Sequence, residues 1–329
     1  MKSARHWARA VSLCLLIARG TASAASPTPT QEPPSCPPPP PAALTAQQVQ
    51  EGMAQAQDRG FLWRITKDGH RSYLYGTIHM ARREWALPGP KTLEALREID
   101  TVALEVDPLD PKVRQALAPG SGRAPATTTE IPAALQERIE RRIAFECLSP
   151  GTFEKLPPEL KVMALTLLAG RRDGLEIGYA IDAVLAGFAR AAHKTIVSLE
   201  TTDVQLAARR AMSDGAKAAS LEKTLDELES GRVAAVLNRL AEMWAASDFA
   251  ALKQYEQRLN DSDSETERAL AKQVIDNRNL GLATRIDALH GSGSKVFAAV
   301  GFMHMIGPAS LPGLLAAKGY DVEAISFRR

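Results

Sequence analysis

The chain carries one short motif twice, once near each end. An apolar run leads into Gly76-Thr77-Ile78-His79, and another leads into Gly301-Phe302-Met303-His304. Leu-Pro-Gly, a helix-like segment and a second strand-like run follow each motif. The sequence therefore predicts two equivalent strand–loop–helix–strand units. A fold that joins these units places two histidines at the ends of neighbouring strands, which suits a metal ion or an acid–base pair.

Composition places the chain among ordinary globular proteins. It has 329 residues, of which 45% are hydrophobic and 24% charged, enough for one large domain or two small ones. The net charge of +2 is close to neutral. Because no basic stripe interleaves with aromatic residues, we expect no nucleic-acid partner.

The first 24 residues are typical of a secretory signal peptide. Basic residues precede the short apolar run Val11–Ala18, and Ala22-Ser23-Ala24 offers a cleavage site. The run is much shorter than the roughly 20 residues of a membrane span, so we expect no transmembrane span in the mature chain. These features predict a periplasmic or secreted protein, with an uncleaved anchor as the alternative.

Residues 25–43 are rich in proline and predict an extended linker before a folded domain at 44–329. Cys36 lies in this linker and Cys147 in the domain, so the two could pair in an oxidising compartment. The sequence leaves that pairing open. No two cysteines have the spacing of a zinc site.

The chain is β-like at both ends and helical between them. A hairpin is expected at 61–78 around Asp68-Gly69, and strands at Thr101–Val106, Thr195–Leu199, Val296–Val300 and Asp321–Ile325. The helices expected between them cover 44–56, 90–99, 132–145, 158–169, 177–193, 204–212, 217–229, 232–247, 264–289 and 309–318, with a loop at 120–129. We therefore predict an α/β fold whose central mixed sheet comes from the N- and C-terminal units, with a large helical insert at about 130–290.

His79, His304 and Glu105 are the leading candidates for chemistry. A glycine three residues before each histidine lets the backbone leave the strand sharply and gives a ligand room. A single such histidine is more often a hydrogen-bonded core residue, but the repeat favours a site. Glu105 follows apolar Val102-Ala103-Leu104, where a buried carboxylate must be paired or metal-bound. Asp107 has the same parity, so either could face the site, and a solvent-facing strand end is the alternative.

Two imidazoles and one carboxylate are ligands suited to manganese, cobalt or zinc, and a water on such an ion could attack a carbonyl group. Without a metal, one histidine could act as general base, oriented by Glu105. Arg278 could bind a substrate carboxylate or orient Glu105. For Glu200, Gln205 and Asp182 an ordinary surface or packing role is at least as good, and none is assigned catalysis.

The motifs together resemble the TraB/GumN family, over roughly residues 60 to 327. The matching segments are Tyr75–His79, Leu104–Asp107, Val197–Thr201 with Gln205, Asn277–Asn279, Val300–His304 and Leu315–Val322. Tiki-type metalloproteases share the two Gly-x-x-His motifs and an acidic residue and need a divalent ion. The resemblance therefore implies that His79, His304 and Glu105 bind the metal. Erythromycin-esterase-like hydrolases are more distant relatives. The methionine after each histidine departs from the usual pattern.

These observations predict an exported metal-dependent hydrolase that acts on a peptide or another amide or ester. Its substrate would be a peptide or a small molecule. His79, His304 and Glu105 would hold the ion, with Glu105 as ligand or base, and Arg278 would position substrate or support Glu105. A non-catalytic periplasmic binding or regulatory protein, and a metal-free His/Glu hydrolase, are the alternatives.

Overall fold

The computed structural model describes residues 35–39, 44–117, 131–154, 156–210, 212–262 and 272–327. Within them lies a six-stranded mixed sheet, which confirms the predicted α/β fold. In sheet order its strands are β4 (Thr195–Ser198), β3 (Thr101–Leu104), β5 (Val296–Gly301), β2 (His70–Thr77), β1 (Phe61–Lys67) and β6 (Asp321–Ile325). The predicted signal peptide, the loop at 120–129 and all of the linker except 35–39 lie outside the described residues.

Strands β1 and β2 form the predicted hairpin. Lys67 pairs with His70, so the turn consists of Asp68 and Gly69, with φ of 52° and 79°. Positive φ at both central residues gives a turn whose twist matches that of the two strands. The sequence Asp-Gly is therefore the local cause of this hairpin.

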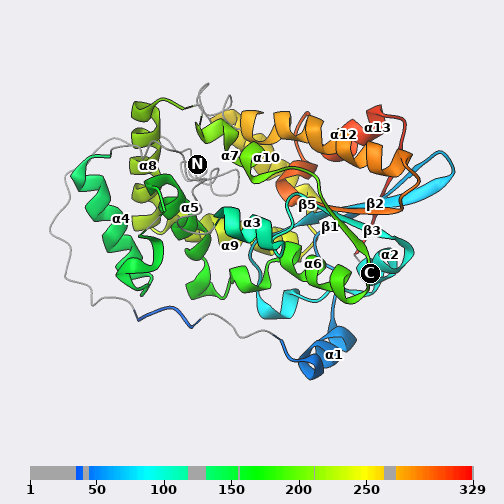
Figure 1. Ribbon diagram of the computed structural model, residues 1–329, viewed down its shortest axis with the longest axis horizontal. Coiled ribbons are helices and arrows are strands. Elements are labelled where there is room, and N and C mark those ends of the chain that lie inside the picture. The colour runs from blue at the N-terminus through cyan, green and yellow to red at the C-terminus, as the bar shows by residue number, and fades with distance from the viewer. Residues whose placement is uncertain are drawn as a thin grey trace.

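The centre of the sheet is parallel and covered on both faces. β5 pairs in parallel with β2 on one side and β3 on the other. Helix α6 (Ile181–Ala191) packs on β3 and helix α12 (Asn277–Gly291) on β5, on opposite sides of the sheet (Figure 1). This explains why every residue of β5 is buried and why the strand is apolar along its whole length.

The two terminal units are present as predicted. The first runs from β2 through α2 (Pro90–Glu98) to β3, and the second from β5 through α13 (Leu311–Ala317) to β6. The strand expected at 101–106 ends earlier, at Leu104. The next residue, Glu105, turns its side chain to the backbone amide of Gly301, at the point where β5 ends.

The remaining helices belong mostly to the middle of the chain. They are α1 (Ala46–Gln55), α3 (Pro111–Leu117), α4 (Ala133–Phe145), α5 (Pro158–Leu168), α7 (Thr202–Arg210), α8 (Asp214–Glu229), α9 (Arg232–Ala245) and α10 (Phe249–Ser262). Short helical turns are η1 (Arg83–Trp85), η2 (Pro150–Phe153), η3 (Arg171–Asp173), η4 (Ile177–Tyr179), the π-helical η5 (Lys272–Asp276) and η6 (Phe302–Met305).

Helices α4, α5, α8 and α9 pack on one another as a helical lobe beside the sheet (Figure 1). The indole Nε1 of Trp244, on α9, donates a 2.8 Å hydrogen bond to the carbonyl of Gly76 on β2. Trp244 is only 1% exposed, so this bond is shielded from water. The lobe is thereby fastened to the strand that leads into the first Gly-x-x-His motif.

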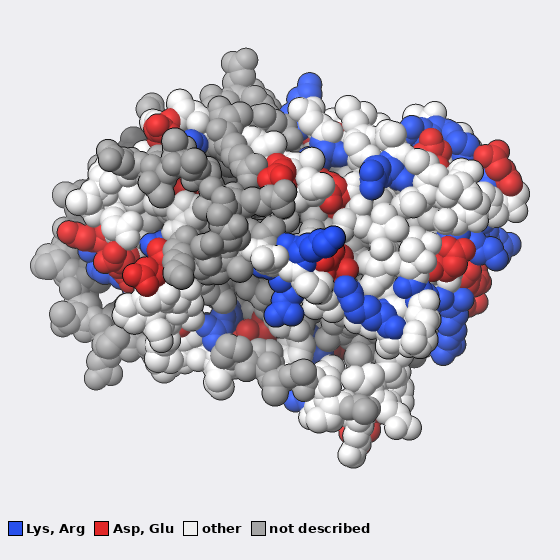
Figure 2. All heavy atoms as spheres, in the orientation of Figure 1, with Lys and Arg blue, Asp and Glu red and all other residues white. Residues whose placement is uncertain are grey.

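The molecular surface is mixed in charge. On the face drawn in Figure 2, basic and acidic side chains lie interspersed over the sheet half of the molecule. In the described part of the chain, no helix combines the length and the apolar character that crossing a membrane requires.

Candidate active site

The two Gly-x-x-His motifs meet at one edge of the sheet. β2 and β5 are adjacent and parallel, and Thr77 lies opposite Gly301 in the register. His79 follows the end of β2, and His304 lies in η6 directly after β5. The carboxyl ends of parallel strands are where α/β sheets present ligand sites. The repeat therefore brings the two imidazoles into one place.

Each motif glycine makes room for the other motif. A Cβ on Gly76 would lie 3.2 Å from the Cα and Cβ of Phe302, in the second motif. A Cβ on Gly301 would lie 3.3 Å from Nε2 of His79, in the first motif, and 3.0 Å from Oε1 of Glu105. Both glycines are thus needed for the close approach of the loops, rather than for an unusual backbone conformation.

His79 is held by Asp182, in the first turn of α6. Asp182 Oδ2 lies 2.7 Å from Nδ1 of His79, and Thr77 donates a 2.6 Å hydrogen bond to Oδ1. The charge of Asp182 raises the pKa of His79 to about 9, against the opposing effect of burial. The ring is therefore an imidazolium at neutral pH. Its side chain is 50% exposed, so it is open to solvent and to a substrate.

His304 has a neutral partner. Its Nδ1 lies 2.5 Å from Oδ1 of Asn279, on α12. The amide nitrogen of Asn279 donates to the carbonyl of Ala309 at 2.8 Å, so the amide oxygen must accept from the ring. His304 is 3% exposed, and this burial lowers its pKa to about 4. The ring is therefore neutral at pH 7, with its lone pair on Nε2.

Glu105 lies between the rings, buried and ionised. Its Oε1 accepts a 2.6 Å bond from the Gly301 amide, and its Oε2 lies 2.5 Å from Nη2 of Arg278. Burial acts to raise the pKa of this carboxyl, but the charges of His304, His79 and Arg278 and the amide bond lower it to about 2. At neutral pH His304 is uncharged, so the charges of Arg278 and His79 are the ones that stabilise the ionised carboxylate of Glu105.

Arg278 joins two carboxylates. Besides Glu105, its guanidinium bonds both oxygens of Glu200, with Nε to Oε2 at 3.0 Å. Gln205, on α7, donates to Oε1 of Glu200 at 2.9 Å and reaches Oε2 of Glu105 at 3.4 Å. Burial raises the pKa of Glu200, although its bonds to Arg278 oppose this. This network fixes the orientation of Glu105 through its Oε2 atom.

Both imidazoles present the same nitrogen to the carboxylate. Each Nδ1 is engaged by its partner, Asp182 or Asn279, which leaves each Nε2 available. Nε2 of His304 lies 3.9 Å from Oε1 of Glu105. One imidazolium, one neutral imidazole and one carboxylate therefore face a common point, and the pair of rings offers an acid and a base at neutral pH.

As arranged, this donor set is not preformed for a metal ion. Both oxygens of Glu105 are engaged, one by the Gly301 amide and one by Arg278. Among the residues that the structure describes, no group of three or more histidine, cysteine or acidic side chains could hold an ion. The engaged Nδ1 atoms do resemble the outer hydrogen bonds that orient metal-binding histidines.

The residues proposed from the sequence, His79, His304, Glu105 and Arg278, all come together in this site. Asp107, the alternative to Glu105, does not reach it and instead bonds Nη2 of Arg190 at 2.6 Å.

Three residues join the site without having been assigned a role in it: Asp182, Glu200 and Gln205. Asn279 is a fourth, as the partner of His304. An acidic residue in the first turn of a helix, such as Asp182, is a common capping feature, so its pattern alone did not indicate a site. For Asn279 the available signal was its place in the segment Asn277–Asn279, which the family resemblance includes.

The methionines of the motifs belong to the core. Met80, Met303 and Met305 are 5%, 8% and 2% exposed. These methionines therefore contribute to the packing of the core.

Comparison with known proteins gives a family. The model of the TraB/PrgY/gumN family matches residues 61–324. The uncharacterized protein YbaP of Shigella flexneri is 25% identical over 265 residues, which cover 76% of this chain and 90% of YbaP. YbaP of Escherichia coli strain K12 matches with the same identity and coverage. No solved structure matches the chain significantly.

Proposed function

The chain belongs to the TraB/PrgY/gumN family, and from this premise we propose that it is a hydrolase of peptide, amide or ester bonds. The reacting groups would be His79, His304 and Glu105. One observation carries the proposal: two imidazoles lie beside one buried carboxylate, with Nε2 of His304 3.9 Å from Oε1 of Glu105 and Nε2 of His79 beside the same oxygen at Gly301. Their different Nδ1 partners and burial give the two rings opposite charge states. Environments that separate two pKa values in this way divide the roles of acid and base.

In this proposal His304 is the general base. Its neutral Nε2 takes a proton from water as the water oxygen attacks the carbonyl carbon. The positive charge that forms on the ring is stabilised by Glu105, 3.9 Å away. His79 is the general acid, because its exposed imidazolium can give the Nε2 proton to the leaving group. Asp182 keeps that ring oriented and charged.

Metal-dependent hydrolysis by the same three residues is the second candidate. It is favoured by the outer-shell hydrogen bonds on both Nδ1 atoms. Manganese, cobalt and zinc are the ions that suit two imidazoles and a carboxylate. Because Glu105 is engaged by Arg278 and Gly301, an ion would need that carboxylate to turn.

We also propose that the protein is exported and acts in the periplasm or outside the cell. The signal-like first 24 residues support this, and so does a disulfide between Cys36 and Cys147, which requires an oxidising compartment. A peptide or small-molecule substrate fits the half-exposed position of His79.

The test is hydrolysis of a panel of fluorogenic peptides and esters by the purified protein. We expect Glu105→Gln and His304→Gln to lower kcat/KM by about 10²-fold or more. His193→Asn is the matched control, because His193 is exposed, at φ of 53°, and asparagine tolerates that backbone. Equal activity of all variants, or no turnover of any substrate under any condition, would overturn the proposal and favour a binding or regulatory protein.

The same assay separates the two chemistries. Each substrate is measured in chelator and then with added manganese, cobalt or zinc. Full activity in chelator supports the acid–base pair. Activity that disappears in chelator and returns with one ion supports the metal-dependent reaction.

A further inference from the structure

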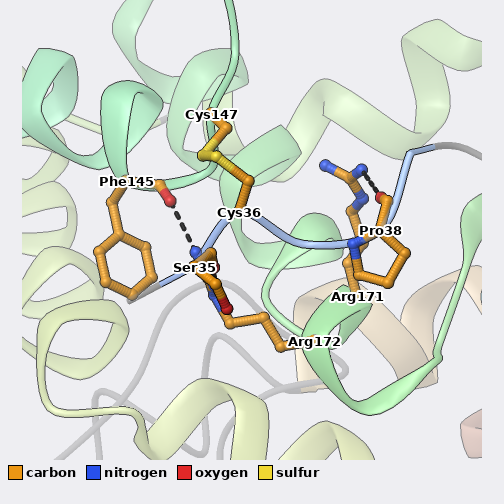
Figure 3. The surroundings of a disulfide bond; sticks show 7 residues. All are labelled: Ser35, Cys36, Pro38, Phe145, Cys147, Arg171 and Arg172. Carbon is orange, nitrogen blue, oxygen red and sulfur yellow. Dashed lines mark hydrogen bonds between the residues drawn. A yellow bond between two sulfur atoms is a disulfide. The ribbon is translucent and has the colours of Figure 1, made fainter. Parts of the chain in front are cut away.

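A short proline-rich segment is fastened to the helical lobe. This segment, Ser35–Pro39, is called the strap below. Cys36 is disulfide-bonded to Cys147, just beyond the end of α4, with the two Cα atoms 5.6 Å apart (Figure 3). Two neighbouring arginines of η3 hold the strap backbone: Arg172 donates to the carbonyl of Ser35, and Arg171 Nη2 to that of Pro38 at 2.7 Å. The lobe thus has a built binding place for a polyproline-like backbone.

Arg171 also forms an ion pair with Glu176. It is 4% exposed, and its Nε lies 3.7 Å from Oε2 of Glu176. The backbone of Glu176 exchanges two hydrogen bonds with Ala81, its N–H to the Ala81 carbonyl at 2.9 Å and the reverse bond at 3.2 Å. Ala81 is two residues beyond His79. A single buried guanidinium therefore connects the strap to the loop that carries this histidine.

The same segment of chain holds the His79 loop at two further points. The Ile181 amide donates to the carbonyl of Ile78 at 3.0 Å, and Asp182 bonds the His79 ring. Residues 170–182 thus lie between the strap and the His79 loop and bond to both. We call this stretch the brace.

The disulfide that closes the strap is accessible. Both Cys36 and Cys147 are exposed. A dithiol reductant can therefore attack one sulfur, form a mixed disulfide and leave as its own cyclic disulfide. The reductant loses two electrons and the two cysteines gain them, each ending as a thiol with one proton.

We propose that the Cys36–Cys147 disulfide is a redox-sensitive clasp, which holds the strap on Arg171 and Arg172 and so keeps the brace and the His79 loop in place. Reduction releases the strap and loosens the contacts between residues 174–182 and 78–81. The two-state element is the strap, docked or free. The consequence for catalysis rests on the proposed function; the structural coupling does not.

Amide hydrogen exchange, read residue by residue, tests the coupling without any substrate. The reporters are the amides of Ala81, Glu176 and Ile181, whose partners cross between the brace and the His79 loop. The reference is the amide of Ala298, in the buried strand β5. On reduction by a dithiol we expect the reporters to exchange faster by about fivefold or more, with the reference unchanged.

Point variants test which contacts connect the strap to the His79 loop. Cys36→Ser should reproduce the effect of reduction in oxidising buffer, and it changes only an exposed side chain. Arg172→Gln is the matched control for Arg171→Gln: both remove a contact with the strap, but only Arg171 forms an ion pair with Glu176. We expect the reporters to respond more to the change at Arg171.

Two results would overturn the clasp. In one, faster exchange is confined to residues near the disulfide while the three reporters stay protected. In the other, reporters and reference accelerate together, which indicates global destabilisation. If a substrate is known, kcat/KM should fall on reduction of the wild type and not of Cys36→Ser. A failed search for a substrate leaves the exchange result valid, so the two proposals fail separately.

Discussion

Replacing Arg278 with methionine should strongly destabilise the protein, because the guanidinium is shared by two buried carboxylates. Its side chain is 14% exposed, and those of Glu105 and Glu200 are 8% and 5% exposed. Methionine removes the guanidinium that both acids share and leaves Glu105 with only the more distant charge of His79. Removing one partner of a buried pair costs about 3–5 kcal/mol, and we expect the free energy of unfolding at pH 7 to fall by that amount.

The loss of unfolding free energy in Arg278→Met should be larger at neutral than at acidic pH. Burial raises the pKa of Glu105, but the neighbouring positive groups bring it to about 2, below the value of an unfolded chain. Such a group stabilises the fold above about pH 4.5, and this contribution is lost as pH falls towards 2. Without Arg278 the pKa of Glu105 rises. The difference between wild type and variant is therefore largest at pH 7 and shrinks below pH 4.5.

Urea unfolding followed by circular dichroism at pH 7 and pH 4 measures both effects. Arg64→Met is the matched control, since Arg64 and its partner Glu323 are 34% and 56% exposed and such pairs contribute at most about 1 kcal/mol. Arg278→Lys should recover part of the stability through its charge. A loss below about 1 kcal/mol at pH 7, or an equal loss at both pH values, would refute the electrostatic reasoning.

Two further predictions concern other parts of the molecule. Gly301→Ala places a methyl group 3.0 Å from Oε1 of Glu105 and 3.3 Å from the His79 ring, so we expect kcat/KM to fall by about tenfold or more while the melting temperature changes by only a few degrees. Wild-type activity in this variant would contradict the close approach. Burial lowers the pKa of His290, so the unfolded chain binds its proton first and stability falls as pH drops below about 6.5. His290→Gln should lose less unfolding free energy than wild type between pH 7 and 5.5, and equal losses would argue against this.

Much of the fold could be predicted because its signals are local. The Asp68-Gly69 turn specifies the hairpin, and Thr45 caps α1 through its own side chain and that of Gln48. The sequence pattern did not predict helix α10, although Asp248 caps this helix by accepting a hydrogen bond from the Ala251 amide. Its polar sequence shows only a weak apolar face, and tertiary packing of Leu252 and Tyr255 completes it.

The site could be predicted only in part, for a related reason. His79, His304 and Glu105 stand at strand ends, and a repeated motif marks the histidines. The bonds that orient them join residues far apart in the sequence: Asp182 is 103 residues from His79, and Arg278 is 173 residues from Glu105. Nothing in the local pattern of α6 or α12 shows which side chain will face a strand end. Such pairs depend on the register of helices on the sheet.

The repeat explains why the two histidines meet but not why they differ. Both follow a glycine by three residues, both end a parallel strand, and both have Nδ1 engaged. The difference comes from the chemical type of the Nδ1 partner and from the burial of each ring. Helix α6 supplies a carboxylate, Asp182, to a ring open to solvent, whereas α12 supplies an amide, Asn279, to a buried ring. Two copies of one motif thus acquire opposite charge states from the helices on opposite faces of the sheet, and an acid–base pair needs that asymmetry.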